Sequence, residues 1–261
     1  MLPGPVLPGP RDRRPAGSGG GCTRSTPLGL PGRRPLALLG FAPVAPASPA
    51  ETPADDLLVR LAAASARHWP AVHAEASVAT VGRTVYVLLP LDEGVAAFAT
   101  ARRLGEQAAA VLDRSVETPL RAACSRIATG PEELPDLRAE VDDVLRVTTA
   151  DPQAPAFATL RDTHARVLLA HVGDELARRP RLRHPGIEAM LEHDRARGTA
   201  FAASVTAWLD AIGNIGDAAA RLTIHPNTLK YRLRRAGELF GVDLDHPDDR
   251  LSCWLQLRLP R

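Results

Sequence analysis

The stretch that decides the fold of the C-terminal half reads Gly216-Asp-Ala-Ala-Ala-Arg-Leu-Thr-Ile-His-Pro-Asn-Thr-Leu-Lys-Tyr-Arg-Leu-Arg-Arg235. Its pattern predicts two short helices joined by a tight turn at Thr223-Ile224. Ala219 is small, which allows the helices to cross closely, and Pro226 suits the first turn of the second helix because its missing N–H costs nothing there. The apolar residues of the second helix recur at the spacing of one buried stripe; they are Leu229, Leu233, Ala236 and Phe240.

The second helix, expected over residues 225–237, turns other side chains away from this stripe. Recognition helices read bases from their N-terminal half, where Asn can pair with adenine, Arg with guanine, and a Thr methyl can contact thymine. The expected base-reading residues are His225, Asn227, Thr228, Tyr231 and Arg232. Polar and basic neighbours suit phosphate contacts, which position a protein without specifying sequence; these are Thr223, Lys230, Arg234 and Arg235.

Charge supports this interpretation locally rather than globally. The whole chain has a formal net charge of only +2. Between Asp217 and Glu238, however, there is no acidic residue, whereas five lysines and arginines fall in that window. The sequence therefore predicts a basic surface on the helix that would meet DNA. A basic helix that docks on an acidic protein partner is the alternative that this pattern leaves open.

The helix pair and its surroundings resemble the C-terminal helix-turn-helix domain of the PucR/CdaR family of bacterial transcriptional regulators. The string Ile224-His-Pro-Asn-Thr-Leu-Lys-Tyr-Arg-Leu-Arg-Arg235, the acidic tail 241–251 and the upstream segment 190–194 carry the resemblance. It implies a Fis-like, homodimeric head that binds double-stranded DNA, with helix 225–237 in the major groove. One departure is Gly216, where the family usually has Ser or Thr, and we expect it to weaken the helix cap slightly.

Residues 55–150 predict a small α/β domain. The expected elements are helices over 55–69, 93–112 and 134–147, a hairpin of strands 77–81 and 84–89 around Gly82-Arg83, and a strand over 120–127. Val95, Phe98, Leu104 and Ala108 are expected on the inner side of the second helix. The segment resembles a degenerate GGDEF-like domain. Because it lacks the Gly-Gly-(Asp/Glu)-Glu-Phe turn, no catalytic residue is expected, and a nucleotide-cyclase-lineage enzyme is the other alternative.

Residues 1–54 are dense in Pro, Gly, Arg and Ala without periodicity, so we expect a disordered segment. A start site placed too far upstream would look the same. Arg33-Arg34 before the apolar run 36–42 resemble an export signal, but the run is short, flanked by prolines and begins more than thirty residues into the chain. No run is long enough to span a membrane. The three widely separated cysteines indicate no disulfide framework, so a protein of the reducing cytoplasm is expected.

The complete expectation is an α+β chain with three parts: a disordered segment 1–54, a GGDEF-like α/β domain 55–150, and a helical DNA-binding domain 151–261 with its helix-turn-helix at 216–237. Cys22, Cys124 and Cys253 form no metal-binding pattern. The aspartates between 243 and 249 do not match a calcium loop. No metal or cofactor is therefore expected, and a small-molecule effector stays unidentified.

Overall fold

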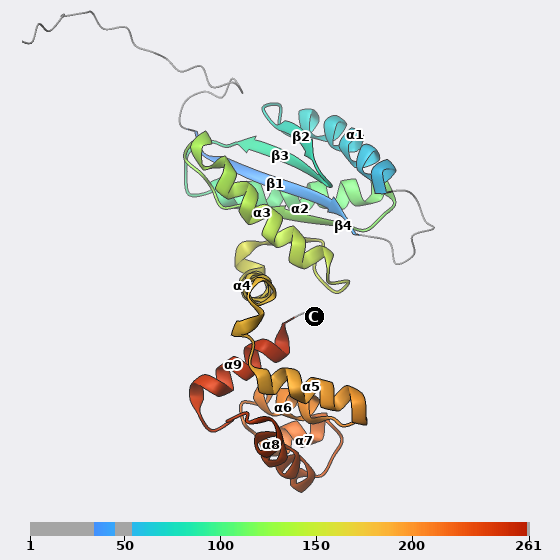
Figure 1. Ribbon diagram of the computed structural model, residues 1–261. Coiled ribbons are helices and arrows are strands. Elements are labelled where there is room, and N and C mark those ends of the chain that lie inside the picture. Colours follow the sequence, from blue (N-terminus) through green and yellow to red (C-terminus); the bar gives the residue numbers. More distant parts are fainter. Residues whose placement is uncertain (1–33, 45–53, 260–261) are drawn as a thin grey trace, which may run out of the picture. The chain divides into compact units, whose positions relative to one another are not determined.

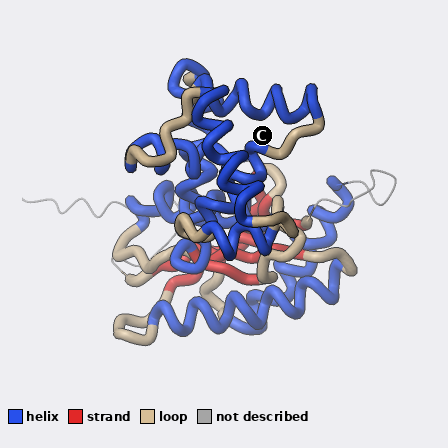
Figure 2. The backbone as a smooth tube through the Cα atoms, turned by 90° about the horizontal axis from the view of Figure 1, so that it is seen from below, coloured by secondary structure: helices blue, strands red, loops and turns tan. Residues whose placement is uncertain are grey.

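The computed structural model describes residues 34–44 and 54–259 of the chain. Its first part is a mixed sheet with helices, and its second part is all-helical, which confirms an α+β fold (Figure 1). In Figure 2 the strands of the sheet lie side by side as red tubes. The elements of the first part are β1 (Leu36–Pro43), α1 (Ala54–Val72), β2 (Ser77–Val81), β3 (Thr84–Pro90), α2 (Ala97–Val116), β4 (Leu120–Cys124), α3 (Leu134–Thr149), β5 (Phe157–Thr159) and α4 (Leu160–Arg178).

The sheet has the strand order β2-β3-β1-β4-β5. Strand β1 lies between β3 and β4 and runs antiparallel to both, while β5 joins the edge of β4 in parallel. From β1 to β4 the elements follow the order β-α-β-β-α-β, which is the ferredoxin-like arrangement. The predicted hairpin 77–81 and 84–89 is confirmed, with β3 one residue longer than expected.

Strand β1 overturns the expectation that residues 1–54 lack structure. All eight of its residues are buried, and the apolar run that resembled an export signal is the centre of the sheet. The run is continuously apolar because helices cover both of its faces, which removes the alternation by which half-buried strands are recognised. The rest of the segment, residues 1–33 and 45–53, lies outside the described residues, and so do Cys22 and Arg33.

Helices α1 and α2 cover one face of the sheet and α3 covers the other (Figure 1). Phe41, Trp69 and Leu112 are fully buried between the sheet and the α1/α2 layer. Helix α3 approaches β1 at Gly40, where an added Cβ would lie 2.4 Å from Cγ1 of Val141. Glycine at this position therefore sets how closely α3 packs on the sheet.

Three expectations about this part need correction. Helix α1 continues past Pro70 to Val72, because the proline lies in the last turn and removes only one helical hydrogen bond. Helix α2 begins at Ala97 rather than residue 93, so Val95 is fully exposed and Phe98 is 37% exposed. The α/β domain does not stop at residue 150, because β5 pairs with β4.

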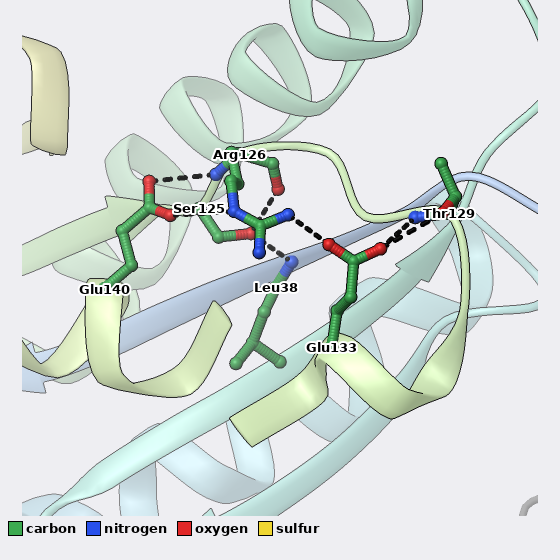
Figure 3. Close-up of polar contacts among 6 residues, drawn as sticks. All are labelled: Leu38, Ser125, Arg126, Thr129, Glu133 and Glu140. Atoms are coloured by element: carbon green, nitrogen blue, oxygen red, sulfur yellow. Dashed lines mark hydrogen bonds and ion pairs between the residues drawn. The ribbon is translucent and has the colours of Figure 1, made fainter. Parts of the chain in front are cut away.

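The loop after β4 is fixed by hydrogen bonds and ion pairs (Figure 3). The Ser125 hydroxyl accepts a hydrogen bond from the main-chain N–H of Leu38 at 2.9 Å. Glu133 accepts from the main-chain N–H of Thr129 at 2.8 Å and pairs with Arg126. These contacts hold the pKa of Glu133 near 2, with the Thr129 N–H as the larger cause. The loop is therefore tied both to β1 and to the start of α3.

The second part consists of α5 (Pro185–Arg197), α6 (Phe201–Asp210), α7 (Ile215–Arg221), α8 (Pro226–Phe240) and α9 (Pro247–Arg258). Its core is built on Ile187, Met190, Val205 and Leu209. Asp210, at the end of α6, accepts hydrogen bonds from Trp254 Nε1 at 2.8 Å and from Arg258. These contacts attach α9 to α6, the helix that supports α7 and α8.

Both cysteine thiols in the described residues are buried. Burial raises the pKa of Cys124 to about 12 and that of Cys253 to about 11. A buried free cysteine of this kind behaves as a small apolar residue. Residues 34–44 and 54–259 contain no group of three or more His, Cys, Asp or Glu side chains that could hold a metal ion. Within the same residues, no helix combines the length and apolar character needed to cross a bilayer.

Candidate nucleic-acid interface

Helices α7 and α8 form the predicted helix-turn-helix. Ala218 and Ala219 of α7 and Leu229 of α8 are buried together, with Leu222 and Ile224 packed at the edge of the cluster. The small Ala219 allows α7 and α8 to approach closely, as its size predicted, and Ala218 is also small and buried there. The observed bounds differ from the expected ones mainly at the end of α8, which continues to Phe240.

The turn between the helices contains an unusual backbone conformation. Thr223 has φ +55°, in the left-handed region, where a β-branched residue is strained. Its N–H still donates to Ala220 O at 3.1 Å, and the N–H of Ile224 donates to Ala219 O at 3.0 Å. The turn is closed by main-chain hydrogen bonds, and the Thr223 side chain stays exposed at its apex.

The cap of α7 is Asn214, not Gly216. The Asn214 side-chain oxygen accepts a hydrogen bond from the N–H of Asp217 at 3.2 Å. Gly216 lies inside the first turn of α7, where no cap is needed. The expected weakening at Gly216 therefore does not apply, because Asn is among the best N-cap residues.

Helix α8 is capped by His225. Its Nδ1 accepts a hydrogen bond from the main-chain N–H of Asn227 at 3.2 Å. An accepting Nδ1 carries no proton, so in the neutral ring the proton is on Nε2. His225 is exposed, and Nε2–H is therefore its donor toward an outside acceptor. From the sequence we expected His225 to read bases but did not expect it to cap α8. Its position directly before Pro226 is the sequence signal for this cap.

The expected base-reading residues do not all lie on one surface. His225, Asn227, Thr228 and Tyr231 are exposed and follow the N-terminal half of α8; Tyr231 is 56% exposed. Arg232 is only half-exposed, and its Nη1 lies 3.4 Å from the hydroxyl of Ser204 on α6. The structure thus brings four of the five residues together and directs the fifth toward the supporting helix.

The expected phosphate-binding residues are exposed or half-exposed, but two of them share a carboxylate. Lys230 is exposed and has no ion-pair partner among the described residues. Arg234 Nε lies 3.6 Å from Glu238, and Arg235 Nη1 lies 3.0 Å from the same carboxylate. Glu238 therefore offsets part of the basic charge. Its spacing from both arginines, three and four residues, is the sequence signal for this pairing.

One flank of α8 is less suited to an anion. A hollow of about 820 Å³ lies there, lined by Lys230, Arg234 and Glu238 of α8 and by Asp243 and Asp245 of the following loop. The three carboxylates would repel a phosphate backbone on this side. Electrostatics therefore favours contact along the exposed outer face and the N-terminal half of α8.

Comparison with known proteins identifies the two parts. Residues 201–259 match the family described as the PucR C-terminal helix-turn-helix domain. The chain carries a PucR helix-turn-helix domain. Residues 23–147 match the GGDEF-like domain family, so the PucR domain follows a GGDEF-like domain that includes β1.

Two curated relatives share part of the sequence. The DNA-binding transcriptional activator AdeR of Bacillus subtilis (strain 168) is 28% identical over 68 residues, which are 26% of this chain and 16% of AdeR. The carbohydrate diacid regulator of Escherichia coli (strain K12) is 55% identical over 38 residues, 15% of this chain and 10% of that regulator. This chain therefore spans only a small share of either relative.

A solved structure of a regulator of polyketide synthase expression from Bifidobacterium adolescentis is 20% identical to this chain. The alignment covers 88% of this chain and 81% of that one, with a TM-score of 0.34. That score is too low to establish a common arrangement. The assignment of the PucR domain rests on the match over residues 201–259.

Proposed function

We propose that this protein is a DNA-binding transcriptional regulator whose helix α8 enters the major groove. The observation that carries the proposal is the exposed polar surface on the N-terminal half of a capped second helix within a PucR domain. Recognition helices of helix-turn-helix proteins contact bases from this half. The regulator names of the two relatives support the same conclusion.

Within this proposal the exposed residues divide into two roles. His225, Asn227, Thr228 and Tyr231 read base edges, whereas Lys230 and Arg235 contact phosphates. Thr223 at the exposed turn adds a further phosphate contact, and so does Arg234, although it borders the hollow that contains three carboxylates. Arg232 reaches bases only if its contact with Ser204 is released, because it now lies against α6.

The proposal includes a cytoplasmic homodimer that binds a pseudo-palindromic site, with the two heads about one turn of DNA apart, roughly 34 Å. A small-molecule effector is expected from the resemblance to regulators, and its identity stays open. The cyclase alternative gains no support from the β2–β3 hairpin, whose turn is Gly82-Arg83 and contains no carboxylate. The protein-partner alternative is a possible outcome of the test below.

The test is fluorescence anisotropy with duplexes from the chain's own upstream region and with scrambled duplexes. Thr228→Ala should change the ranking of sequences, whereas Arg235→Ala should weaken all duplexes alike. Arg114→Ala, an exposed arginine on α2, is the control for loss of one charge. Affinity should fall as salt rises. Equal binding to all sequences by the wild-type protein, or no binding at low salt, would contradict the proposal.

A further inference from the structure

The two edges of the sheet are built differently. At one edge β5 has only three residues and continues directly into α4, and such a short strand offers little to pair with. At the other edge β2 has the sequence Ser-Val-Ala-Thr-Val, with no charge and no proline. Four of its five residues are exposed. Within residues 34–44 and 54–259, strand β2 thus lacks the features that usually protect an edge strand from pairing.

The main-chain groups of β2 that face outward follow from its turn. Gly82 has φ +58° and Arg83 is not among the residues with positive φ, as in a two-residue hairpin turn with Gly first. Such a turn places Val81 and Thr84 in a hydrogen-bonded pair. Alternation along the strand then directs the N–H and C=O groups of Val78 and Thr80 away from β3.

The residues around β2 are also self-complementary. If two copies of β2 pair antiparallel about a two-fold axis at Ala79, Val78 of each copy lies opposite Thr80 of the other, in register for about four main-chain hydrogen bonds. The same register brings Glu75 of each copy beside Arg83 of the other. Both side chains are exposed: Glu75 keeps 53% of its side-chain surface although it contacts Arg34, and Arg83 lies at the open turn.

We propose that β2 is the dimerisation edge of this protein and that its occupant is β2 of a second copy, giving one continuous sheet across the dimer. The proposal rests on the dimeric regulator proposed above and names the surface that holds the dimer together. Uncharged backbone pairing supplies the contact, and two symmetric Glu75–Arg83 pairs select the register. A strand of another protein with only acidic or only basic residues at its ends could pair with Glu75 or with Arg83 of this chain, but not with both.

Four variants of the full chain and one control variant test the proposal by sedimentation velocity without DNA. Thr80→Pro removes an outward N–H that β3 does not use, a substitution that edge strands tolerate. Ala79→Lys places two lysines face to face at the axis, and Val95→Lys at a fully exposed loop residue is its control. Arg83→Glu sets like charges opposite each other. The double variant Glu75→Arg/Arg83→Glu restores opposite charges between the two copies, at the loss of the Glu75–Arg34 pair within each copy.

The wild-type protein and Val95→Lys should sediment as dimers. Thr80→Pro and Ala79→Lys should sediment as monomers with unchanged thermal unfolding of the α/β domain. Arg83→Glu should raise the dimer dissociation constant by roughly tenfold, because two exposed ion pairs are lost. The double variant should recover most of the lost affinity between the two copies. A monomeric wild-type protein, or dimers equally tight in all variants, would overturn the proposal.

The DNA measurement separates this inference from the proposed function. If the wild-type protein selects its site but the β2 variants leave its oligomeric state unchanged, the DNA-binding function stands and the β2 interface is wrong. If the β2 variants are monomeric but the wild-type protein selects no DNA sequence, the interface stands and the proposed function is wrong.

Discussion

His225 Nδ1 lies 3.2 Å from the main-chain nitrogen of Asn227 and accepts its hydrogen. One imidazole thus caps α8 through one nitrogen and presents the other to the outside. Capping and base contact can be separated by substitution, because Asn also caps helices well.

His225→Asn should keep the cap and lose the ring donor. We expect an unchanged melting temperature and an affinity for the preferred duplex lowered by about tenfold, within the range of one base contact. His225→Ala should lose the contact and also about 1 kcal/mol of stability. Thermal unfolding and anisotropy on both variants check this, and normal DNA selection by His225→Asn would exclude His225 from base reading.

Glu238→Gln should strengthen binding to every duplex. The carboxylate pairs with Arg234 and Arg235. Without its charge, both guanidinium groups are free to contact DNA phosphates. The slope of log affinity against log salt should steepen by about one. Glu192→Gln on α5, where Glu192 pairs with Arg195 at 3.0 Å, makes the same charge change away from α8. If both variants strengthened DNA binding equally, the gain would come from the net charge of the protein and not from the Glu238 pairs with Arg234 and Arg235.

Gly40→Ala should destabilise the α/β domain. The new Cβ would lie 2.4 Å from Val141 and 3.0 Å from Leu145, so α3 must move away from β1. Such overpacking costs about 1–3 kcal/mol, which urea denaturation can measure. Gly173→Ala in α4, where a Cβ makes only ordinary contact, should instead stabilise the protein slightly. An unchanged midpoint for Gly40→Ala would show that α3 is not seated as described.

Glu133→Gln should reduce stability near neutral pH and have little effect in acid. The pKa of Glu133 is lowered to about 2 by the Thr129 N–H and by Arg126. A carboxyl group with a lowered pKa stabilises the folded state at any pH above its ordinary pKa. This stabilisation is lost as the pH falls toward about 2. The melting temperatures of wild type and variant should converge between about pH 5 and 2. Glu132→Gln is the control, and a gap independent of pH would contradict the assignment.

Strong periodicity made much of the fold predictable. The apolar stripe of residues 134–147 predicted α3 nearly at its observed bounds. β1 was missed because it is apolar throughout and lies between Pro-rich segments. The composition of the whole segment predicted disorder, and the short apolar run has no alternation that would have indicated a strand. β5 was missed because three residues carry no detectable alternation.

At the interface the outer side of α8 was predictable and the partners of its side chains were not. Spacing placed Asn227 and Tyr231 opposite the buried stripe, and both are exposed. Arg232 lies at the border between the two sides of the helix, and only the position of Ser204 on α6 decides where its guanidinium lies. Contacts of this kind depend on tertiary packing that a single helix does not encode.

The place of β1 in the chain has a consequence for synthesis. It leaves the ribosome before either of its neighbours, yet its partners extend to Pro90 in β3 and Cys124 in β4. Until residue 124 has been translated, the apolar strand β1 cannot pair with β4, and that edge of β1 stays unpaired. Nascent chains of this protein are therefore expected to need a chaperone during that interval, and a stalled or truncated product should aggregate through this strand.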